Sequence, residues 1–155
     1  MSLETIISGG QTGADRAGWD VALELGLAIG GWIPRGRRAE DGEVPTRYGG
    51  LRETDTDVYR ERTEKNVAEA DATVVFSFGP PTGGSGMTAE WARRQGKPLL
   101  VLDLGGGDED GTAGRLRDWL TREQVRVLNV AGPRASGEPR IGDAVARVLH
   151  RALGG

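Results

Sequence analysis

Two glycine-rich turns constrain the fold of this chain more than any other feature of its sequence. Each follows a short apolar run and precedes a helical pattern, the first as Ser8-Gly9-Gly10-Gln11-Thr12-Gly13 and the second as Thr82-Gly83-Gly84-Ser85-Gly86. A strand that ends in such a turn and continues as a helix leaves backbone N–H groups pointing outward, where the helix dipole favours an anion. Two such turns at strand carboxyl ends predict a two-walled pocket for a phosphorylated or otherwise anionic ligand.

The composition restricts the classes of protein and site that these turns can serve. The chain has 155 residues, a formal net charge of −3, no cysteine and 26 glycines. A general nucleic-acid binder carries a basic surface, so the acidic balance disfavours that class. The lack of cysteine excludes a disulfide framework, a thiolate metal site and a cysteine nucleophile. Because the chain also has a single histidine, His150, we expect no transition-metal site made by the protein itself.

The length and the N-terminal sequence lead to expectations about domain organisation and compartment. A chain of this size predicts one domain over residues 1–155. Its first residues lack the basic and apolar regions of a signal peptide, and no apolar stretch reaches membrane-spanning length. We therefore expect a cytoplasmic protein with no membrane partner and no nucleic-acid partner.

Apolar runs alternate with amphipathic runs along the chain, a pattern typical of a parallel sheet with crossover helices. We predict an α/β fold, a single Rossmann-like three-layer domain with a five-stranded, mostly parallel sheet and helices on both faces. The second glycine turn is expected to precede a helix over residues 87–95. The expected strands, each followed by a helix, are residues 4–8, 28–33, 72–78, 98–103 and 125–130.

The irregular stretch at residues 34–56 is too long for an ordinary connection. Because it follows the second predicted strand, it should emerge at the same sheet edge as both glycine turns. Its arginines Arg35, Arg37 and Arg38 would then close over a negatively charged ligand. Trp32, just before the stretch, is the best placed of the four tryptophans to stack on a flat ring. The alternative is a disordered surface loop.

The first turn departs from both common phosphate-binding motifs. It lacks the Lys-Ser or Lys-Thr of a Walker loop. Gly10 and Gly13 match the second and third glycines of a dinucleotide fingerprint, but Ser8 replaces the first glycine. Arg35 stands near the end of the second predicted strand, where an acidic residue would hold the NAD ribose. The turn therefore favours anion binding over NAD binding.

Charged and polar residues beside the two turns are candidate ligand contacts. Asp15 either complements the dipole of the first helix or accepts a hydrogen bond from a ligand amine or hydroxyl. Arg16 suits a phosphate, because a guanidinium fork matches phosphate geometry. Glu90, about one turn into the third helix, is either a base near the pocket or a solvated carboxylate. Thr88 either caps that helix or donates to an anion.

Two further groups of polar residues are expected near the same edge of the sheet. Arg62, Thr63 and Asn66 share one face of the helix before the third strand. They interrupt the apolar stripe that a crossover helix should bury, which favours a functional role. After the last strand, Asn129 or Ser136 can reach a ligand, and a plain turn is the alternative.

Five segments resemble the molybdenum carrier protein family, in the same order and over nearly the whole chain. They are SGGQTGADR at 8–16, GRRAEDG at 36–42, RTEKNV at 62–67, TGG at 82–84 and NVAGPR at 129–134. The resemblance implies a Rossmann-type fold related to lysine-decarboxylase-like and nucleotide-binding domains. It implies storage or transfer, without catalysis, of molybdenum cofactor, a phosphorylated pterin (molybdopterin) whose dithiolene holds molybdenum. It also implies a homo-oligomer and molybdoenzymes as recipients.

The pocket argument and the resemblance together define a set of ligand-binding residues. Two anion sites and a flat ring describe a nucleotide equally well, so a nucleotide sensor remains an alternative. No catalytic residue and no protein metal ligand belong to the carrier interpretation. The predicted cofactor-binding residues are Gly9, Gly10, Gln11, Thr12, Gly13, Asp15, Arg16, Arg35, Arg37, Arg62, Asn66, Thr82, Gly83, Gly84, Ser85, Gly86, Thr88 and Glu90.

A rival enzymatic interpretation comes from the second turn. Residues 83–90 are similar to the glycine-rich signature of the cytokinin-activating phosphoribohydrolases, which cleave a base from a nucleoside monophosphate. In that family the closing glutamate is catalytic, and it corresponds to Glu90. The chain departs from the signature at Met87, where threonine should follow the last glycine, and at Thr82, where proline is usual. Both departures weaken the hydrolase alternative.

Overall fold

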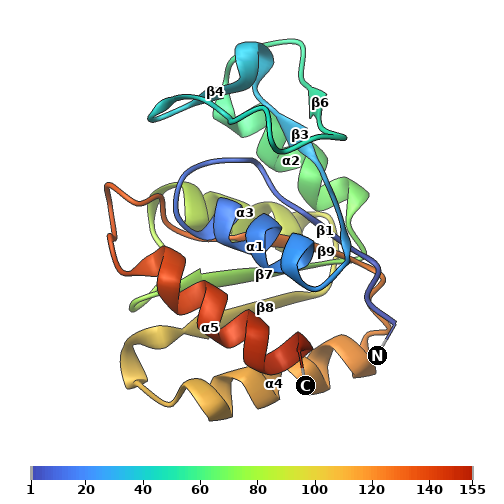
Figure 1. Cartoon of the computed structure of the whole chain (residues 1–155), viewed down its shortest axis with the longest axis vertical. Coiled ribbons are helices and arrows are strands. Elements are labelled where there is room, and N and C mark those ends of the chain that lie inside the picture. Colours follow the sequence, from blue (N-terminus) through green and yellow to red (C-terminus); the bar gives the residue numbers. More distant parts are fainter. Residues whose placement is uncertain (1, 155) are drawn as a thin grey trace.

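A five-stranded parallel sheet forms the centre of the computed structural model, which describes residues 2–154 (Figure 1). The strand order across the sheet is β2-β1-β9-β7-β8, and every pairing in it is parallel. The Rossmann-like α/β fold predicted from the sequence is therefore confirmed. The strands are β1 (Thr5–Ile7), β2 (Ala28–Gly30), β7 (Ala72–Ser77), β8 (Leu99–Asp103) and β9 (Val127–Ala131).

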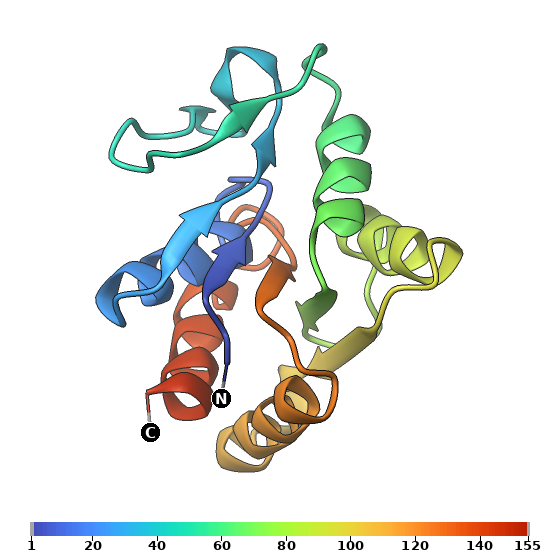
Figure 2. The same cartoon turned by 90° about the vertical axis from the view of Figure 1, so that its right-hand side faces the viewer.

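Five α-helices cover the two faces of this sheet. Helix α5 contacts both α1 and α4, whereas α2 and α3 contact each other. Figure 2 shows α1 and α5 on one side of the sheet and α2 and α3 on the other. The helices are α1 (Ala14–Glu24), α2 (Tyr59–Glu69), α3 (Gly83–Arg94), α4 (Glu109–Arg122) and α5 (Ile141–Leu153).

The hydrophobic pattern of each element explains its place in these layers. Strand β7 is covered on both faces, and all six of its residues are buried. Helix α5 buries a single stripe that includes Ile141, Val145, Val148 and Leu149. Such a stripe at three- and four-residue spacing stabilises a helix by packing against the core, not by intrinsic propensity.

The chain reverses its direction across the sheet between β1 and β7. From β1 the chain passes through α1 to β2 at one edge, and from β7 it passes through α3 to β8 at the other. Strand β9 lies between β1 and β7. In open α/β sheets, a ligand crevice forms at the carboxyl ends of the strands where the winding reverses. Both glycine turns follow strands at this point.

Residues 34–56, here called the arm, form a small projection that Figure 1 shows beyond the main sheet. The arm contains a short 3-10 helix, Arg35–Arg37, and the hairpin of β4 (Arg38–Ala39) and β5 (Gly42–Glu43). Its last strand, β6 (Arg52–Glu53), pairs in parallel with β3 (Trp32–Ile33). Hydrogen bonds and short strands thus order the arm, and the alternative of a disordered loop is wrong.

Two boundaries differ from the sequence expectations. Helix α3 begins at Gly83 and not near Met87, so the second glycine turn is itself the first turn of the helix. The expected strand at residues 28–33 is divided into β2 and β3 at Gly31. Gly31 has φ 124°, and a Cβ there would lie 2.4 Å from the carbonyl oxygen of Ser8. Only glycine permits this bend beside the first turn.

Within residues 2–154, no helix has the length and apolar character needed to cross a membrane.

Replacing Gly10 with alanine is expected to destabilise the fold. Gly10 has φ 78°, and its Cβ would lie 3.0 Å from side-chain carbons of Ile33, Trp19 and Val44. Gly26 has φ 77° with nothing within 4 Å, so Gly26→Ala is a control with the same backbone strain. Gly10→Ala should lower the free energy of unfolding by about 1–3 kcal/mol more than the control. Urea denaturation measures both losses, and equal losses would contradict the packing argument.

Candidate functional site

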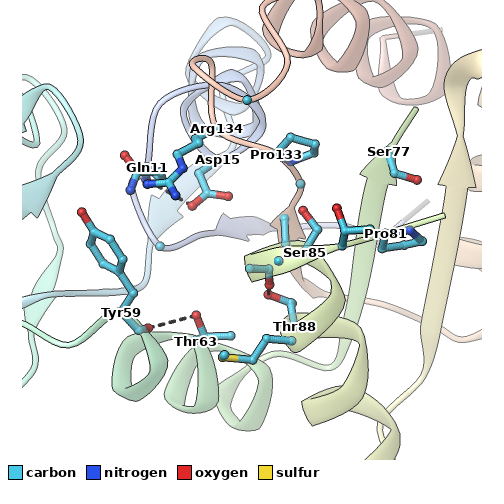
Figure 3. Close-up of a pocket in the computed structure, with 18 of the residues that line it drawn as sticks. Gln11, Asp15, Tyr59, Thr63, Ser77, Pro81, Ser85, Thr88, Pro133 and Arg134 are labelled. Carbon is cyan, nitrogen blue, oxygen red and sulfur yellow. Dashed lines mark hydrogen bonds between the residues drawn. The ribbon is translucent and has the colours of Figure 1, made fainter. Parts of the chain in front are cut away.

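A cavity of about 600 Å³ opens at the carboxyl ends of β1, β9 and β7 (Figure 3). Its volume lies within the range of about 300–1,000 Å³ that is usual for small-molecule sites. Four segments line it: the β1–α1 turn, one face of α2, the turn and first helical turn after β7, and the β9–α5 loop. Because β9 separates β1 from β7, these two strands lie about 10 Å apart, and the turns that follow them form opposite walls of the cavity.

The α3 wall presents backbone N–H groups to the cavity. The first hydrogen bond of this turn runs from the Gly86 N–H to the Thr82 carbonyl oxygen (3.2 Å). Among residues 2–154, the N–H groups of Gly83, Gly84 and Ser85 have no protein acceptor. A Cβ at Gly83 or Gly84 would meet nothing within 4 Å. The wall therefore combines free donors, open space and the positive end of a helix dipole, which together suit an anion.

The β1–α1 wall carries a buried carboxylate, Asp15. The Gln11 N–H donates to its Oδ2 atom at 3.1 Å, and the Arg62 guanidinium lies 3.6 Å from the same oxygen. The side chains of Asp15 and Arg62 are only 9% and 10% exposed. Arg62 also donates to the carbonyl oxygen of Gly9 and, at 3.2 Å, to the hydroxyl of Thr63. These contacts fasten α2 to the first glycine turn.

Burial shifts the pKa values of both partners. Loss of water raises the pKa of Asp15 to about 6, although Arg62 and the Gln11 N–H act in the opposite direction. Desolvation lowers the pKa of Arg62, and the charge of Asp15 partly restores it. A carboxylate with a pKa near 6 changes its charge close to neutral pH, so the charge of the β1–α1 wall depends on pH in this range.

The charged residues around the cavity give it a small excess of positive charge. Arg60, Arg62 and Arg134 line it, against Asp15 and Glu138. Arg134 comes from the β9–α5 loop, and within the described part of the chain it makes no salt bridge. An anionic ligand is therefore compatible with the net charge of the cavity.

The cavity brings together just over half of the predicted binding residues. They come from both turns and from α2, as the parallel topology requires. Those that line it are Gly9, Gln11, Asp15, Arg62, Asn66, Thr82, Gly83, Gly84, Ser85 and Thr88. The predicted residues outside the lining are Gly10, Thr12, Gly13, Arg16, Arg35, Arg37, Gly86 and Glu90.

Several of the outlying residues hold the first turn in place. Arg16 donates to the Gly10 carbonyl oxygen (3.1 Å) and forms a two-pronged pair with Asp41 of the arm (2.6 and 2.8 Å). The Thr12 hydroxyl donates to Glu40, also in the arm. Gly13 has φ 84°, and its Cβ would lie 2.5 Å from the Pro133 carbonyl oxygen. The close packing of Gly10 and Gly13 against the protein thus requires glycine at both positions, independently of any ligand.

The arm arginines also bind protein groups. Arg37 donates to the carbonyl oxygens of Val44, Pro45 and Tyr48 at 3.0, 2.9 and 3.2 Å. Arg35 is exposed and reaches the Asp55 carbonyl oxygen at 3.5 Å. None of residues 34–56 lines the cavity, so the expectation that these arginines close over the ligand has no support in the structure.

Trp32 and Glu90 also lie away from the cavity lining. The cations of Arg52 and Lys65 lie 4.3 and 4.6 Å from the centre of the Trp32 ring. Glu90 is about half exposed and lies 3.8 Å from Arg93 and 3.4 Å from Arg94 on its own helix. Because α3 begins at Gly83, Glu90 lies about two turns into the helix and not one turn as expected, and it is outside the cavity lining. Its interpretation as a solvated carboxylate agrees with these contacts.

The sequence argument missed two prominent lining residues, Tyr59 and Arg134. Tyr59 precedes Arg62 by three residues and Thr63 by four, so the helical face already recognised would have included it. Arg134 belongs to the polar loop after β9, where Asn129 and Ser136 were the named candidates. Asn129 lines the cavity, whereas the Ser136 N–H faces Glu40 at 3.4 Å.

The fold and the cavity define a Rossmann-like protein with a candidate binding site at a reversal of sheet winding. The chain belongs to the circularly permutated YpsA SLOG family, whose model matches residues 6–153. It is similar to a crystal structure described as "Putative molybdenum carrier protein" from Syntrophus aciditrophicus SB. The two share 43% sequence identity with a TM-score of 0.96, over 98% of this chain and 96% of the other. No curated protein matches the chain.

Replacing Asp15 with asparagine is expected to change how stability depends on pH. The folded protein holds the proton of Asp15 more tightly, because its pKa is about 6 against a usual value of 3.8. Relative to Asp15→Asn, the wild type should therefore lose up to about 3 kcal/mol of unfolding free energy as the pH rises from about 4 to about 7. Above that range the difference should be constant. Urea unfolding across the range tests this, and a pH-independent difference would contradict it.

Proposed function

We propose that this protein binds molybdenum cofactor, as phosphorylated molybdopterin, in the cavity between its two glycine turns. The observation that carries the proposal is the α3 N-terminus, where three backbone N–H groups without protein acceptors face an open cavity. Such an array binds phosphate through fixed dipoles and hydrogen bonds. The name of the structural neighbour, a putative molybdenum carrier, supports this choice of ligand.

The proposal assigns each part of the ligand to a part of the cavity. The phosphate lies against Gly83, Gly84 and Ser85, and the flat pterin lies between α2 and the β9–α5 loop. The positive charges of Arg62 and Arg134 offset part of the ligand's negative charge. Within residues 2–154, no cluster of three or more His, Cys, Asp or Glu side chains could hold a metal ion. The proposed ligand brings molybdenum on its own dithiolene.

The role we propose is storage or transfer of the cofactor, with molybdoenzymes as the recipients. No reacting group is required of the protein in such a role, and the exposed position of Glu90 gives no support to hydrolysis. We further propose that residues 1–155 act as one carrier domain, that identical chains assemble into an oligomer, and that the protein works in the cytoplasm.

The direct test is native mass spectrometry of protein purified without oxygen from a host that makes molybdenum cofactor. We expect a mass increment equal to the phosphorylated pterin, with molybdenum in the same fraction by elemental analysis. An increment equal to a nucleotide, without molybdenum, would overturn the proposal in favour of a nucleotide sensor.

A charge at Gly84 should abolish this binding without harming the fold. Gly84→Asp places a carboxylate in open space at the second residue of α3, where the helix dipole favours it. Repulsion of the phosphate should lower the molybdenum content of the purified protein at least about tenfold. Gly84→Asn has the same shape without the charge and is the matched control. Equal losses in the two variants, or no loss in either, would contradict an anion site at α3.

A further inference from the structure

The two walls of the cavity differ in chemistry, although both follow glycine turns. The α3 wall offers backbone donors, whereas the β1–α1 wall offers the carboxylate of Asp15. Figure 3 shows Asp15 directed into the cavity from the wall across from Ser85. An anion favoured at the first wall is repelled at the second, so a ligand that spans both must itself have two different ends.

One oxygen of Asp15 is free to receive a ligand. Its Oδ2 atom accepts the Gln11 N–H and faces Arg62, and the Gly9 N–H also stabilises the charged carboxylate, while no hydrogen bond within residues 2–154 ends on Oδ1. Within residues 2–154, every side-chain oxygen or nitrogen that is fully buried has a hydrogen-bond partner. Because Oδ1 has no such bond, it must be exposed, and Asp15 lines the cavity. A ligand that covers Oδ1 without donating a hydrogen bond would leave an ionised carboxylate buried and unsatisfied, which is costly.

We propose that Asp15 accepts a hydrogen bond from the amino-substituted edge of the ligand's heterocycle, and so determines which ring the cavity binds. This inference rests on the proposed function, because it takes the ligand to be a phosphorylated pterin. The amino group of such a pterin lies at the end of the ring system remote from the phosphate. With the phosphate at α3, the amino edge therefore lies toward the β1–α1 wall. A ring with a carbonyl in place of the amino group would direct an oxygen at the carboxylate and be rejected.

The protonation state of Asp15 depends on its burial and on the charged groups that surround it. A proton on Oδ1 turns that atom into a donor, and a proton on Oδ2 leaves Oδ1 an uncharged and weaker acceptor, so either change weakens its preference for an amino group. The preference should therefore weaken as the pH falls through the pKa of Asp15. The charged groups on the elements around Asp15 are Arg16 of α1, Arg60 and Arg62 of α2, and Arg134 and Glu138 of the β9–α5 loop.

Two small ring compounds test the inference without the complete cofactor. Pterin-6-carboxylate carries the amino group, and lumazine-6-carboxylate has a carbonyl in its place, while the carboxylate of each stands in for the phosphate. Titration calorimetry with wild-type protein emptied of ligand should give at least about tenfold tighter binding of the pterin, equivalent to one charge-assisted hydrogen bond. The ratio should fall toward one between about pH 7.5 and about pH 5.

Variants separate recognition by Asp15 from general effects of charge and folding. Asp15→Asn should bring the pterin-to-lumazine ratio close to one at both pH values. Asp118→Asn, an exposed change on α4, should leave the wild-type ratio intact. Circular dichroism reports the folding of each variant, and the wild-type ratio and its pH dependence need no variant at all.

The outcomes distinguish failure of this inference from failure of the proposed function. If the purified protein carries molybdenum and pterin but binds both probes alike, or binds neither, the role of Asp15 is overturned and the carrier function stands. If the protein carries a nucleotide and no molybdenum, the proposed function fails. In that case a pterin-to-lumazine ratio of one overturns the role of Asp15 as well, and a ratio that depends on Asp15 supports it.

Discussion

Arg62 crosses from α2 to the first glycine turn, and the shape of the cavity depends on the contacts it makes there. Its guanidinium binds the Gly9 carbonyl oxygen and lies beside the Asp15 carboxylate, with all three groups largely removed from water. A Cβ at Gly9 would occupy the place of the guanidinium, so the missing side chain makes room for Arg62. An isolated charge in this position would be strongly unfavourable, and each member of the pair makes burial of the other tolerable.

The fold was predictable because its signals are local and repeated. The continuous apolar run of β7 predicts a buried strand, and the spacing of apolar residues in α5 predicts an amphipathic helix. The common edge for both turns follows from parallel topology alone. The beginning of α3 was missed because glycines weigh against a helix by propensity, whereas here Gly83 and Gly84 form its first turn. The missing side chains of both glycines leave open space beside the first turn of α3, and this space is part of the cavity.

The site was less predictable, because residue type does not reveal whether a side chain faces a ligand or another part of the protein. Arg16 and Arg37 are residue types that often bind phosphate, yet the guanidinium groups of both donate to oxygens of the protein itself. Glu90 matched a catalytic motif, but the helical phase of α3 turns it toward Arg93 and Arg94. Asp15 left two interpretations open, and its burial beside the cavity, which residue type does not reveal, is what supports the ligand contact that we propose. Such distinctions depend on contacts between segments far apart in the sequence.

The arm is attached to the cavity wall at both ends, although none of its residues lines the cavity. At its root, the Asn66 side chain pairs with the N–H and carbonyl of Trp32 at 2.8 and 2.9 Å. At its tip, the Gln11 side chain accepts the Glu40 N–H at 2.9 Å. Asn66 and Gln11 both line the cavity, so the arm and the ligand share supports. If the proposed ligand contacts Asn66 or Gln11, thermodynamic linkage requires that displacing the arm alters ligand affinity to the same degree that the ligand restrains the arm.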